Sequence, residues 1–134
     1  METMEMMKRK RGGIGEGKPG EDAVCTWLVE RGHVILDRNW HYGHLEIDIV
    51  SVAPDGIHFV EVKSRRGPVD VAPEEGVTLR KQRRVARAAA AWLARPDRPK
   101  LPEMEAFMDV AAVTFLPDRT EIAWFPAAFV PIFV

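Results

Sequence analysis

The sequence predicts an α/β fold in which helices flank a mixed central β-sheet. Three observations predict it: a helical pattern of apolar residues near the start of the chain, β-rich segments around a turn signal, and an alanine-rich helical pattern before two more β-rich segments. The predicted order is helix, three strands, helix, two strands, which is typical of a layered α/β domain. The 134 residues correspond to about one domain, and 46% apolar residues are enough for a core.

The first residues are expected to lie outside this domain. Residues 1–16 are predicted as a flexible basic tail and residues 17–134 as the domain. The tail lacks the positive region followed by an apolar stretch that marks a secretory signal, and no apolar run is long enough to span a bilayer. The single cysteine, Cys25, excludes an intramolecular disulfide. These features favour a cytoplasmic protein that does not enter the membrane.

The first helix is predicted over residues 19–31, because apolar residues repeat at helical spacing on one face and Gly32 follows as a stop signal. Glu21 projects from the same apolar face. A carboxylate in that position either lies at the edge of the core or has a function. A short strand over residues 33–36 follows, and then a polar stretch.

Two further strands are predicted to form a hairpin. Residues 46–52 and 57–63 are rich in β-branched residues and flank the turn signal Pro54-Asp55-Gly56. The remaining elements are predicted as a loop over 67–76, a helix over about 74–94, a connector over 95–104, strands over 107–115 and 121–125, and an apolar end over 125–134 that packs on the sheet as a short turn.

Charged residues interrupt both strands of this hairpin. Glu46 and Asp48 share one face of the first strand, because successive side chains on a strand alternate faces. If the turn spans residues 53–56, Asp48 lies opposite Glu61, and Glu46 then lies opposite Lys63. A turn that is tighter by two residues places Asp48 opposite Lys63 and leaves the face unchanged.

This arrangement suits a divalent cation. Opposed carboxylates repel each other unless positive charge lies between them, and Lys63 supplies only part of that charge. Mg²⁺ or Mn²⁺ would supply it better, because such hard ions bind carboxylates and keep waters for phosphate oxygens. The ion would polarise a phosphate and lower the pKa of a bound water, while Lys63 would stabilise the developing charge or orient the attacking water. The alternative is an exposed hairpin face held by salt bridges.

Cations cluster in two places, although the net charge is only −1. Residues 80–87 hold five cations and no anion, and residues 63–66 form a second cluster. Such patches suit a phosphate-bearing partner. The candidate contacts are Arg65, Arg66, Arg80, Lys81, Arg83, Arg84 and Arg87. Lys81 also continues the apolar line of its helix, so it either reaches toward the acidic residues or extends from the core edge to solvent.

Other residues with chemical potential have ordinary structural explanations. His41 and His44 are expected in a polar loop, since one cysteine does not support a structural zinc site. His58 is expected on the surface of its strand. The four tryptophans are expected in the core, and Cys25 is expected to be an inert buried thiol.

Asp48 together with Glu61-Val62-Lys63 resembles the Asp…(Asp/Glu)-x-Lys signature of the restriction-endonuclease-like nuclease superfamily. The chain as a whole resembles the YraN-like family of small bacterial proteins, which is related to archaeal Holliday junction resolvases. The matching stretches are Gly20-Glu21 with Ala23, Arg38-Asn39-Trp40, Glu46-Ile47-Asp48, Phe59-Val60-Glu61-Val62-Lys63 with Arg65, Lys81, and Asp109-Val110. Leu45 and Phe107 depart from the family pattern, in which glycine and arginine are usual.

The resemblance implies a restriction-endonuclease-like α-β-β-β-α-β core. It implies that Asp48 and Glu61 are metal ligands and that Lys63 is the catalytic lysine. Glu21 would be the helix carboxylate that completes the metal site. The expected activity is hydrolysis of DNA phosphodiester bonds with Mg²⁺ or Mn²⁺, on branched or repair intermediates.

Two other functions fit the same sequence. One is a non-catalytic nucleic-acid-binding module on the nuclease fold, and the other is a protein-interaction domain without affinity for DNA. The related resolvases act as dimers, so the apolar C-terminal segment is either a homodimer interface or the last part of the core.

Overall fold

The computed structural model describes residues 18–67, 78–97 and 100–129, which form a five-stranded sheet and two helices. The elements are α2 (Lys18–Glu30), β1 (Val34–Tyr42), β2 (Leu45–Ala53), β3 (Gly56–Arg66), α3 (Leu79–Ala94), β4 (Ala106–Phe115) and β5 (Thr120–Phe129). The strands lie side by side in chain order; β3 and β4 are parallel, and the other neighbours are antiparallel. The predicted class and the predicted order of elements are confirmed.

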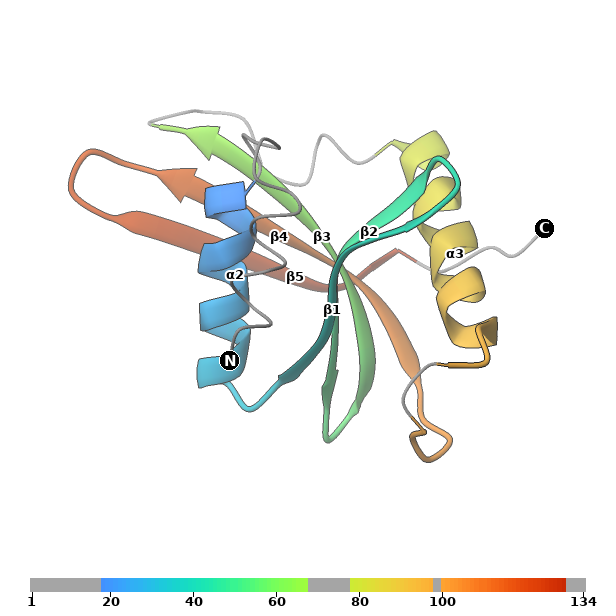
Figure 1. Ribbon diagram of the computed structural model, residues 1–134. Coiled ribbons are helices and arrows are strands. Elements are labelled where there is room, and N and C mark those ends of the chain that lie inside the picture. Colours follow the sequence, from blue (N-terminus) through green and yellow to red (C-terminus); the bar gives the residue numbers. More distant parts are fainter. Residues whose placement is uncertain (1–17, 68–77, 98–99, 130–134) are drawn as a thin grey trace.

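The two helices cover opposite faces of the twisted sheet (Figure 1). The cluster under α2 consists of buried Val24, Cys25, Leu28, Ile49, Val60, Ala111 and Val113. The cluster under α3 consists of Leu45, Ile47, Val50, Ile57, Phe59, Val85, Ala88, Ala89, Trp92, Met108 and Val110. Strands β2, β3 and β4 contribute to both clusters. They are therefore buried on both faces, which explains their nearly continuous apolar sequences.

Strand β1 is longer than predicted, because the polar stretch after residue 36 belongs to it. Its polar side chains find partners on both helices. Arg38 Nη2 donates to Asp22 Oδ1 of α2 at 2.6 Å, and Trp92 Nε1 of α3 donates to Asp37 Oδ2 at 2.9 Å. A polar sequence can therefore remain in the sheet, since buried polar groups with partners carry little penalty.

The second helix begins later than its apolar pattern predicts. Thr78 is its N-cap, with extended dihedral angles of φ −76° and ψ 164°. The Thr78 hydroxyl oxygen accepts the Lys81 N–H at 3.1 Å and so satisfies one of the free amides of the first turn. The described helix therefore begins at Leu79 and not near residue 74, which corrects the prediction.

The last strand continues beyond its predicted end. β5 reaches Phe129, where the sequence predicted a short turn from residue 125. Pro126 is tolerated because β5 is an edge strand and its pairing with β4 contains a register shift. Ala127 has a φ of +49°, and its N–H donates to the buried Asp109 Oδ1 at 2.7 Å. A side-chain carboxylate thus stabilises the irregular backbone.

The hairpin of β2 and β3 has the register that the longer predicted turn requires. Ala53 pairs with Gly56, and the pairing continues without a shift to Ile49 and Val60. Gly56 has a φ of +148°, and a Cβ at this position would overlap the carbonyl oxygen of Glu105. The glycine is therefore required both by its backbone angle and by the close approach of β4.

Strands β2 and β3 separate at one end of the sheet. Their pairing ends at Ile49 and Val60, whereas β2 stays paired with β1 and β3 stays paired with β4 beyond this point. The sheet thus divides into two arms, and both helices begin at this end of the molecule (Figure 1). The junction is called the fork below, and its first residues are Asp48 on β2 and Glu61 on β3.

The backbone of β2 changes face at the fork. Ile47 and Val50 both belong to the cluster under α3, whereas Ile49 belongs to the cluster under α2. Regular alternation would place Ile47 and Ile49 on the same face. On the neighbouring strand, Asn39 lies between their pairing partners and has a φ of +50°. A local irregularity therefore interrupts both strands beside Asp48.

Some predicted features lie outside the described residues. These are the basic tail of residues 1–16, the loop from residue 68 onward, and the end of the chain from residue 130. In the part of the chain that the structure describes, no helix is both long and apolar enough to cross a bilayer.

Candidate functional site

Asp48 links the two arms at the fork. Its residue surface is 9% exposed, and its Oδ2 accepts the Val62 N–H at 2.8 Å. Burial raises the pKa of Asp48 well above its ordinary value, and the nearby charge of Glu61 raises it further. Glu21 and Glu46 act in the same direction, while the hydrogen bond from Val62 opposes them. Asp48 is thus a buried acid among other acids.

Glu61 faces this acid from β3. Its side chain is 11% exposed, and its Oε2 lies 3.2 Å from Nζ of Lys81 on α3. Burial raises the pKa of Glu61, whereas the charges of Lys81 and Lys63 lower it. The charge of Glu61 acts on Asp48 and that of Lys63 acts on Glu61, so the three residues lie near one another as predicted, although Asp48 and Glu61 lie one position beyond the last paired residues of the two strands. Lys81 reaches toward the acidic residues, which is the first of the two possibilities that the sequence left open for it.

Glu46 does not form the predicted cross-strand pair with Lys63. It lies opposite His41 on β1, and its Oε1 is 3.8 Å from His41 Nε2. The physical reason is that β2 follows β1 and leaves β3 beyond the fork. The charge of Glu46 still raises the pKa values of Asp48 and Glu61, so the residue remains close to the site.

Glu21 contributes a third buried carboxylate from the first turn of α2. It is 8% exposed, accepts a hydrogen bond from Asn39 Nδ2, and lies 4.0 Å from Arg38 Nη2. The helix approaches closely because Gly20 has no side chain; a Cβ there would overlap Ser64 Oγ. The sequence indicated a role for Glu21 but did not reveal Asn39 and Arg38 as the groups that hold it.

The donor chemistry of the fork fits a hard divalent cation. Asp48 and Glu61 offer carboxylate oxygens, and burial together with the charge of Glu61 raises the pKa of Asp48, so a cation beside Asp48 would favour its ionised form. Magnesium commonly takes one or two protein carboxylates and completes its shell with water and phosphate. Over the described ranges, no three acidic, histidine or cysteine side chains are arranged as a metal-binding group.

The arginines of α3 surround a hollow on the solvent side of this helix. The hollow measures about 370 Å³ and is lined by His44, Arg80, Arg83, Arg84 and Arg87. An Nη of Arg84 donates to the His44 carbonyl oxygen at 3.2 Å, which ties the tip of the β1–β2 arm to α3. The predicted cationic cluster is thus divided: Lys81 contacts the fork, and the four arginines face the hollow.

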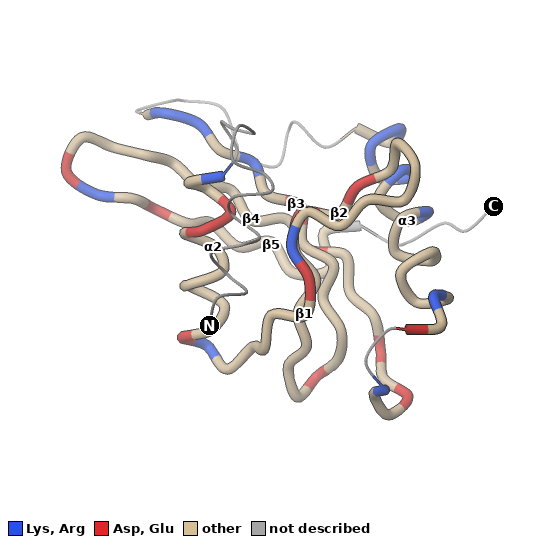
Figure 2. Tube along the Cα trace, viewed as in Figure 1, with Lys and Arg blue, Asp and Glu red and all other residues tan. Residues whose placement is uncertain are grey.

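Arg65 and Arg66 lie on the other arm, at the outer end of β3. Arg65 Nε donates to Thr114 Oγ1 at 3.4 Å, and the guanidinium of Arg66 lies 5.9 Å from the centre of the Phe115 ring. Figure 2 shows basic residues at this strand end on one side and along α3 on the other. Positive charge therefore flanks the acidic fork on both sides.

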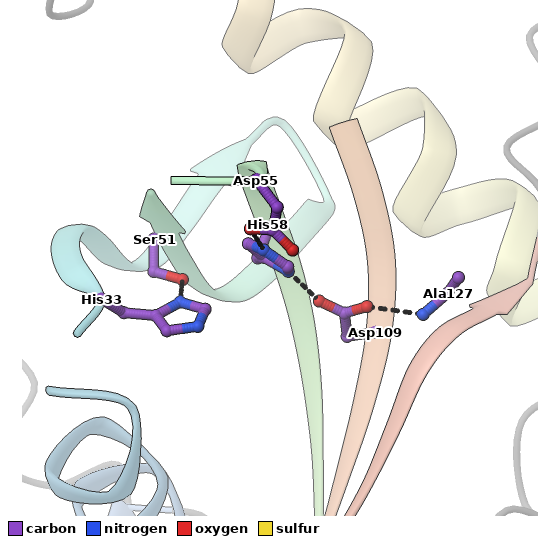
Figure 3. A network of polar contacts seen from close by, with 6 residues as sticks. All are labelled: His33, Ser51, Asp55, His58, Asp109 and Ala127. Atoms are coloured by element: carbon purple, nitrogen blue, oxygen red, sulfur yellow. Dashed lines mark hydrogen bonds and ion pairs between the residues drawn. The ribbon is translucent and has the colours of Figure 1, made fainter. Parts of the chain in front are cut away.

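A second buried polar cluster lies at the turn end of β3, away from the fork (Figure 3). His58 is 5% exposed and lies between Asp109 Oδ2 at 2.5 Å and Asp55 Oδ1 at 2.8 Å. The expectation that His58 lies on the surface is therefore wrong, because β3 is covered on both faces. His33 lies beside it and is hydrogen-bonded to Ser51 Oγ at 2.9 Å. An acid at position 109, inside an apolar strand, is the sequence signal for this cluster.

The opposing influences on His58 leave it the more basic of the two imidazoles. Burial alone lowers the pKa of His58, but hydrogen bonds and charges from Asp109 and Asp55 raise it above its ordinary value. Burial and the neighbouring His58 lower the pKa of His33. The carboxylates of Asp109 and Asp55 thus favour the protonated form of His58, whereas burial and the neighbouring His58 disfavour the protonated form of His33.

The other expectations about aromatic and sulfur side chains have mixed outcomes. Trp92 and Cys25 are buried as predicted. Trp27, Trp40 and Trp124 are only partly buried and pack at the edges of the two clusters.

Comparison with known proteins identifies a family. Residues 20–113 match the family described as "Uncharacterised protein family UPF0102". A UPF0102 protein of Anaeromyxobacter dehalogenans is 40% identical over 123 residues, which cover 88% of this chain and 90% of the relative. One from Syntrophotalea carbinolica is 40% identical over 113 residues, or 84% of this chain and 89% of the relative.

A UPF0102 protein of Nitratidesulfovibrio vulgaris strain DP4 is 44% identical over 81 residues, and this match spans only 60% of that relative and 60% of this chain. The matched segment of the family contains both strands of the fork and the described part of α3. The chain therefore belongs to the UPF0102 family, the YraN-like family that its motifs resemble, and its mixed sheet with two flanking helices is consistent with a restriction-endonuclease-like core.

Proposed function

We propose that this protein is a metal-dependent nuclease that hydrolyses phosphodiester bonds of DNA, with branched or repair intermediates as substrates. The observation that carries the proposal is the pair of buried carboxylates, Asp48 and Glu61, on the two strands that part at the fork. Their mutual repulsion and burial favour binding of Mg²⁺ or Mn²⁺ between them.

Asp48 and Glu61 would hold the metal. The hydrogen bond from the Val62 N–H fixes the orientation of the Asp48 carboxylate, so one ligand is already positioned in the free protein. A bound divalent ion supplies Lewis acidity for the phosphate and lowers the pKa of an attacking water. Lys63 follows Glu61 by two residues on the same strand, and its ammonium would stabilise the charge that develops on the phosphate oxygens.

Lys81 and Glu21 would adjust this site. Lys81 neutralises Glu61 in the metal-free protein and would give up this ion pair when the metal binds, which leaves its ammonium near the substrate phosphate. Glu21 adds negative charge near Asp48 from α2, on the side of the sheet opposite to α3 (Figure 1). Arg38 and Asn39 keep its carboxylate in place.

A cleavage assay tests the proposal directly. Purified protein is incubated with branched, single-stranded and duplex DNA in Mg²⁺ and, separately, in Mn²⁺. We expect cleavage that Asp48→Ala abolishes and that Lys63→Ala slows by about 100- to 1000-fold, since one transition-state donor is lost. Asp118→Ala is the matched control, because Asp118 is exposed in the turn between β4 and β5. Absence of any Asp48-dependent cleavage on all three substrates with both metals would reject the enzyme.

One observation favours a second function, a non-catalytic nucleic-acid-binding module. The arginine-lined hollow needs no metal, and Lys81 already satisfies Glu61. This alternative predicts DNA binding that weakens with salt but survives both chelation and Asp48→Ala. Binding of that kind, without cleavage, would favour it over the nuclease.

A further inference from the structure

An exposed aromatic ring stands at the tip of the β1–β2 arm. Tyr42 is 60% exposed and stacks on Trp40 with the ring centroids 6.1 Å apart and the planes at 9°. Arg95, which follows α3, lies 5.6 Å from the centre of the Trp40 ring. The Tyr42 ring therefore packs against the Trp40 ring, and this contact fixes the orientation of Tyr42 although the ring is exposed.

The ring lies on the α3 side of its arm. Tyr42 pairs directly with Leu45, and cross-strand partners project from the same face of a sheet. Leu45 packs in the cluster under α3, together with Val85. The face of Tyr42 is thus the face toward α3. The apolar ring is left uncovered there by the described part of the chain.

The arginine hollow begins two residues farther along the same turn. His44 lines it together with the four arginines of α3, and the hydrogen bond from Arg84 to the His44 carbonyl holds the turn against the helix. None of these arginines forms an ion pair with a carboxylate among the residues that the structure describes. The hollow therefore combines concentrated positive charge with a neighbouring aromatic platform.

From this juxtaposition we infer that the tip of the β1–β2 arm and α3 form a binding surface for single-stranded nucleic acid. The arginines bind successive phosphates, and an unpaired base stacks on Tyr42. A base inside a duplex is already stacked on both sides, so the ring discriminates between unpaired and paired segments. The inference rests on the proposed function for its DNA substrate and adds the requirement for an unpaired segment.

The binding surface also lies close enough to the fork for a bound strand to reach its acidic residues. Lys81 contacts Glu61, and Arg84 lies one helical turn later and contacts the hollow. A strand held by the arginines therefore runs within one turn of α3 from the acidic pair. An unpaired stretch next to a junction or a processed end would then be the segment that the protein holds.

Binding measured in EDTA tests the inference without cleavage. Fluorescence anisotropy compares a labelled single strand with a matched duplex, for the wild type, Tyr42→Ala, Tyr42→Phe and the double variant Arg83→Gln/Arg87→Gln. We expect the wild type to prefer the single strand. Tyr42→Ala should weaken single-strand binding about five-fold or more and leave duplex binding unchanged, and Tyr42→Phe should retain the preference because it keeps the ring.

The double arginine variant should weaken binding to both DNAs. It should also reduce the slope of log affinity against log salt for the single strand, by about 0.7 for each lost phosphate contact. Arg119→Gln is the matched control and should leave affinities unchanged, since Arg119 lies in the β4–β5 turn, far from α3 (Figure 1). Thermal denaturation of each variant establishes that it is folded.

Three outcomes would overturn the inference. The first is an equal loss of single-strand and duplex affinity in Tyr42→Ala, and the second is no loss of either affinity in this variant. The third is a change of Tyr42→Ala from dimer to monomer in sedimentation with unchanged DNA affinity, which would show that a second copy of the chain covers Tyr42. Failure of the proposed nuclease is distinguishable, because the EDTA measurements contain no cleavage. A protein that binds single strands through Tyr42 but never cleaves DNA would retain the inference and lose the nuclease.

Discussion

The surroundings of Asp48 disfavour its ionised form. Burial and three neighbouring acids raise its pKa above the ordinary value of 3.8, so the charged carboxylate is less favourable in the folded chain than in the unfolded chain. As pH rises from 3.8 through the raised folded pKa, this residue therefore removes stability from the metal-free protein. Such a position is typical of a ligand site, where function and stability conflict.

Replacing this acid should separate stability from metal binding. In EDTA at neutral pH, we expect Asp48→Asn to increase the free energy of unfolding by about 0.5–2 kcal/mol, because a buried charge beside other acids is removed. Saturating Mn²⁺ should raise the melting temperature of the wild type and of Asp118→Asn, but not that of Asp48→Asn. Urea titration and thermal melts measure both effects. A destabilised Asp48→Asn protein in EDTA would contradict the electrostatic account.

His58 should give the protein a different dependence on pH. Its folded pKa lies above the ordinary imidazole value of 6.5, so the stabilisation is complete below 6.5 and is lost as pH rises through the folded pKa. We expect the difference in unfolding free energy between wild type and His58→Gln to shrink as pH increases from 6 to 9. NMR titration should also show His33 losing its proton at lower pH than His58. A pH-independent difference would contradict this prediction.

At the scale of elements, the first turn of α2 packs closely on the strand β3 because a glycine lies at the contact. Gly20 faces Ser64, and a Cβ at Gly20 would overlap Ser64 Oγ and lie 3.2 Å from Ser64 Cβ. This contact sets how far Glu21 reaches toward the fork. Alanine is the better helix former by about 1 kcal/mol, so helix propensity and packing make opposite predictions here.

We expect packing to decide the effect of Gly20→Ala. The variant should lose about 1–3 kcal/mol of stability, as is typical for an overpacked contact. Adding Ser64→Ala removes the hydroxyl that the new methyl group meets, so the double variant should recover most of the loss. Chemical denaturation of the four proteins in this double-mutant cycle measures the coupling. A more stable single variant would show that α2 can shift away from β3.

At the scale of the whole molecule, one sheet carries two hydrophobic clusters. Leu28 is fully buried in the cluster under α2, and Met108 is 1% exposed in the cluster under α3. Adjacent residues of β2, β3 and β4 alternate between the clusters, so neither can be lost without releasing the strands that form the other. The two clusters should therefore unfold together.

Two core variants test this cooperativity. Leu28→Ala and Met108→Ala should each lower stability by about 2–5 kcal/mol and keep a single unfolding transition. Far-UV circular dichroism follows the backbone, and tryptophan fluorescence reports on Trp27 of α2, Trp92 of α3 and the partly buried Trp40 and Trp124. Coincident transitions in both variants are expected. A separate early transition for one helix would show that the clusters are independent.

The charge distribution also belongs to the whole molecule. The net charge is −1, yet basic residues lie on both sides of an acidic fork. The sequence revealed the two cationic clusters because neighbouring residues on the chain share a charge. It could not show that Lys81 turns to Glu61 while the arginines around it face His44, since these partners are 20 and about 40 residues away.

The order of the elements and the approach of Asp48 to Glu61 followed from the sequence, because alternation along strands is a local property, but the sequence left two turn lengths open and the structure decided between them. Only the tertiary structure decided where β2 leaves β3, which partners hold Glu21, and that His58 is buried. These features depend on contacts between distant segments, such as Asn39 with Glu21 and His58 with Asp109. Local periodicity carries no information about such contacts, and at the fork they override it.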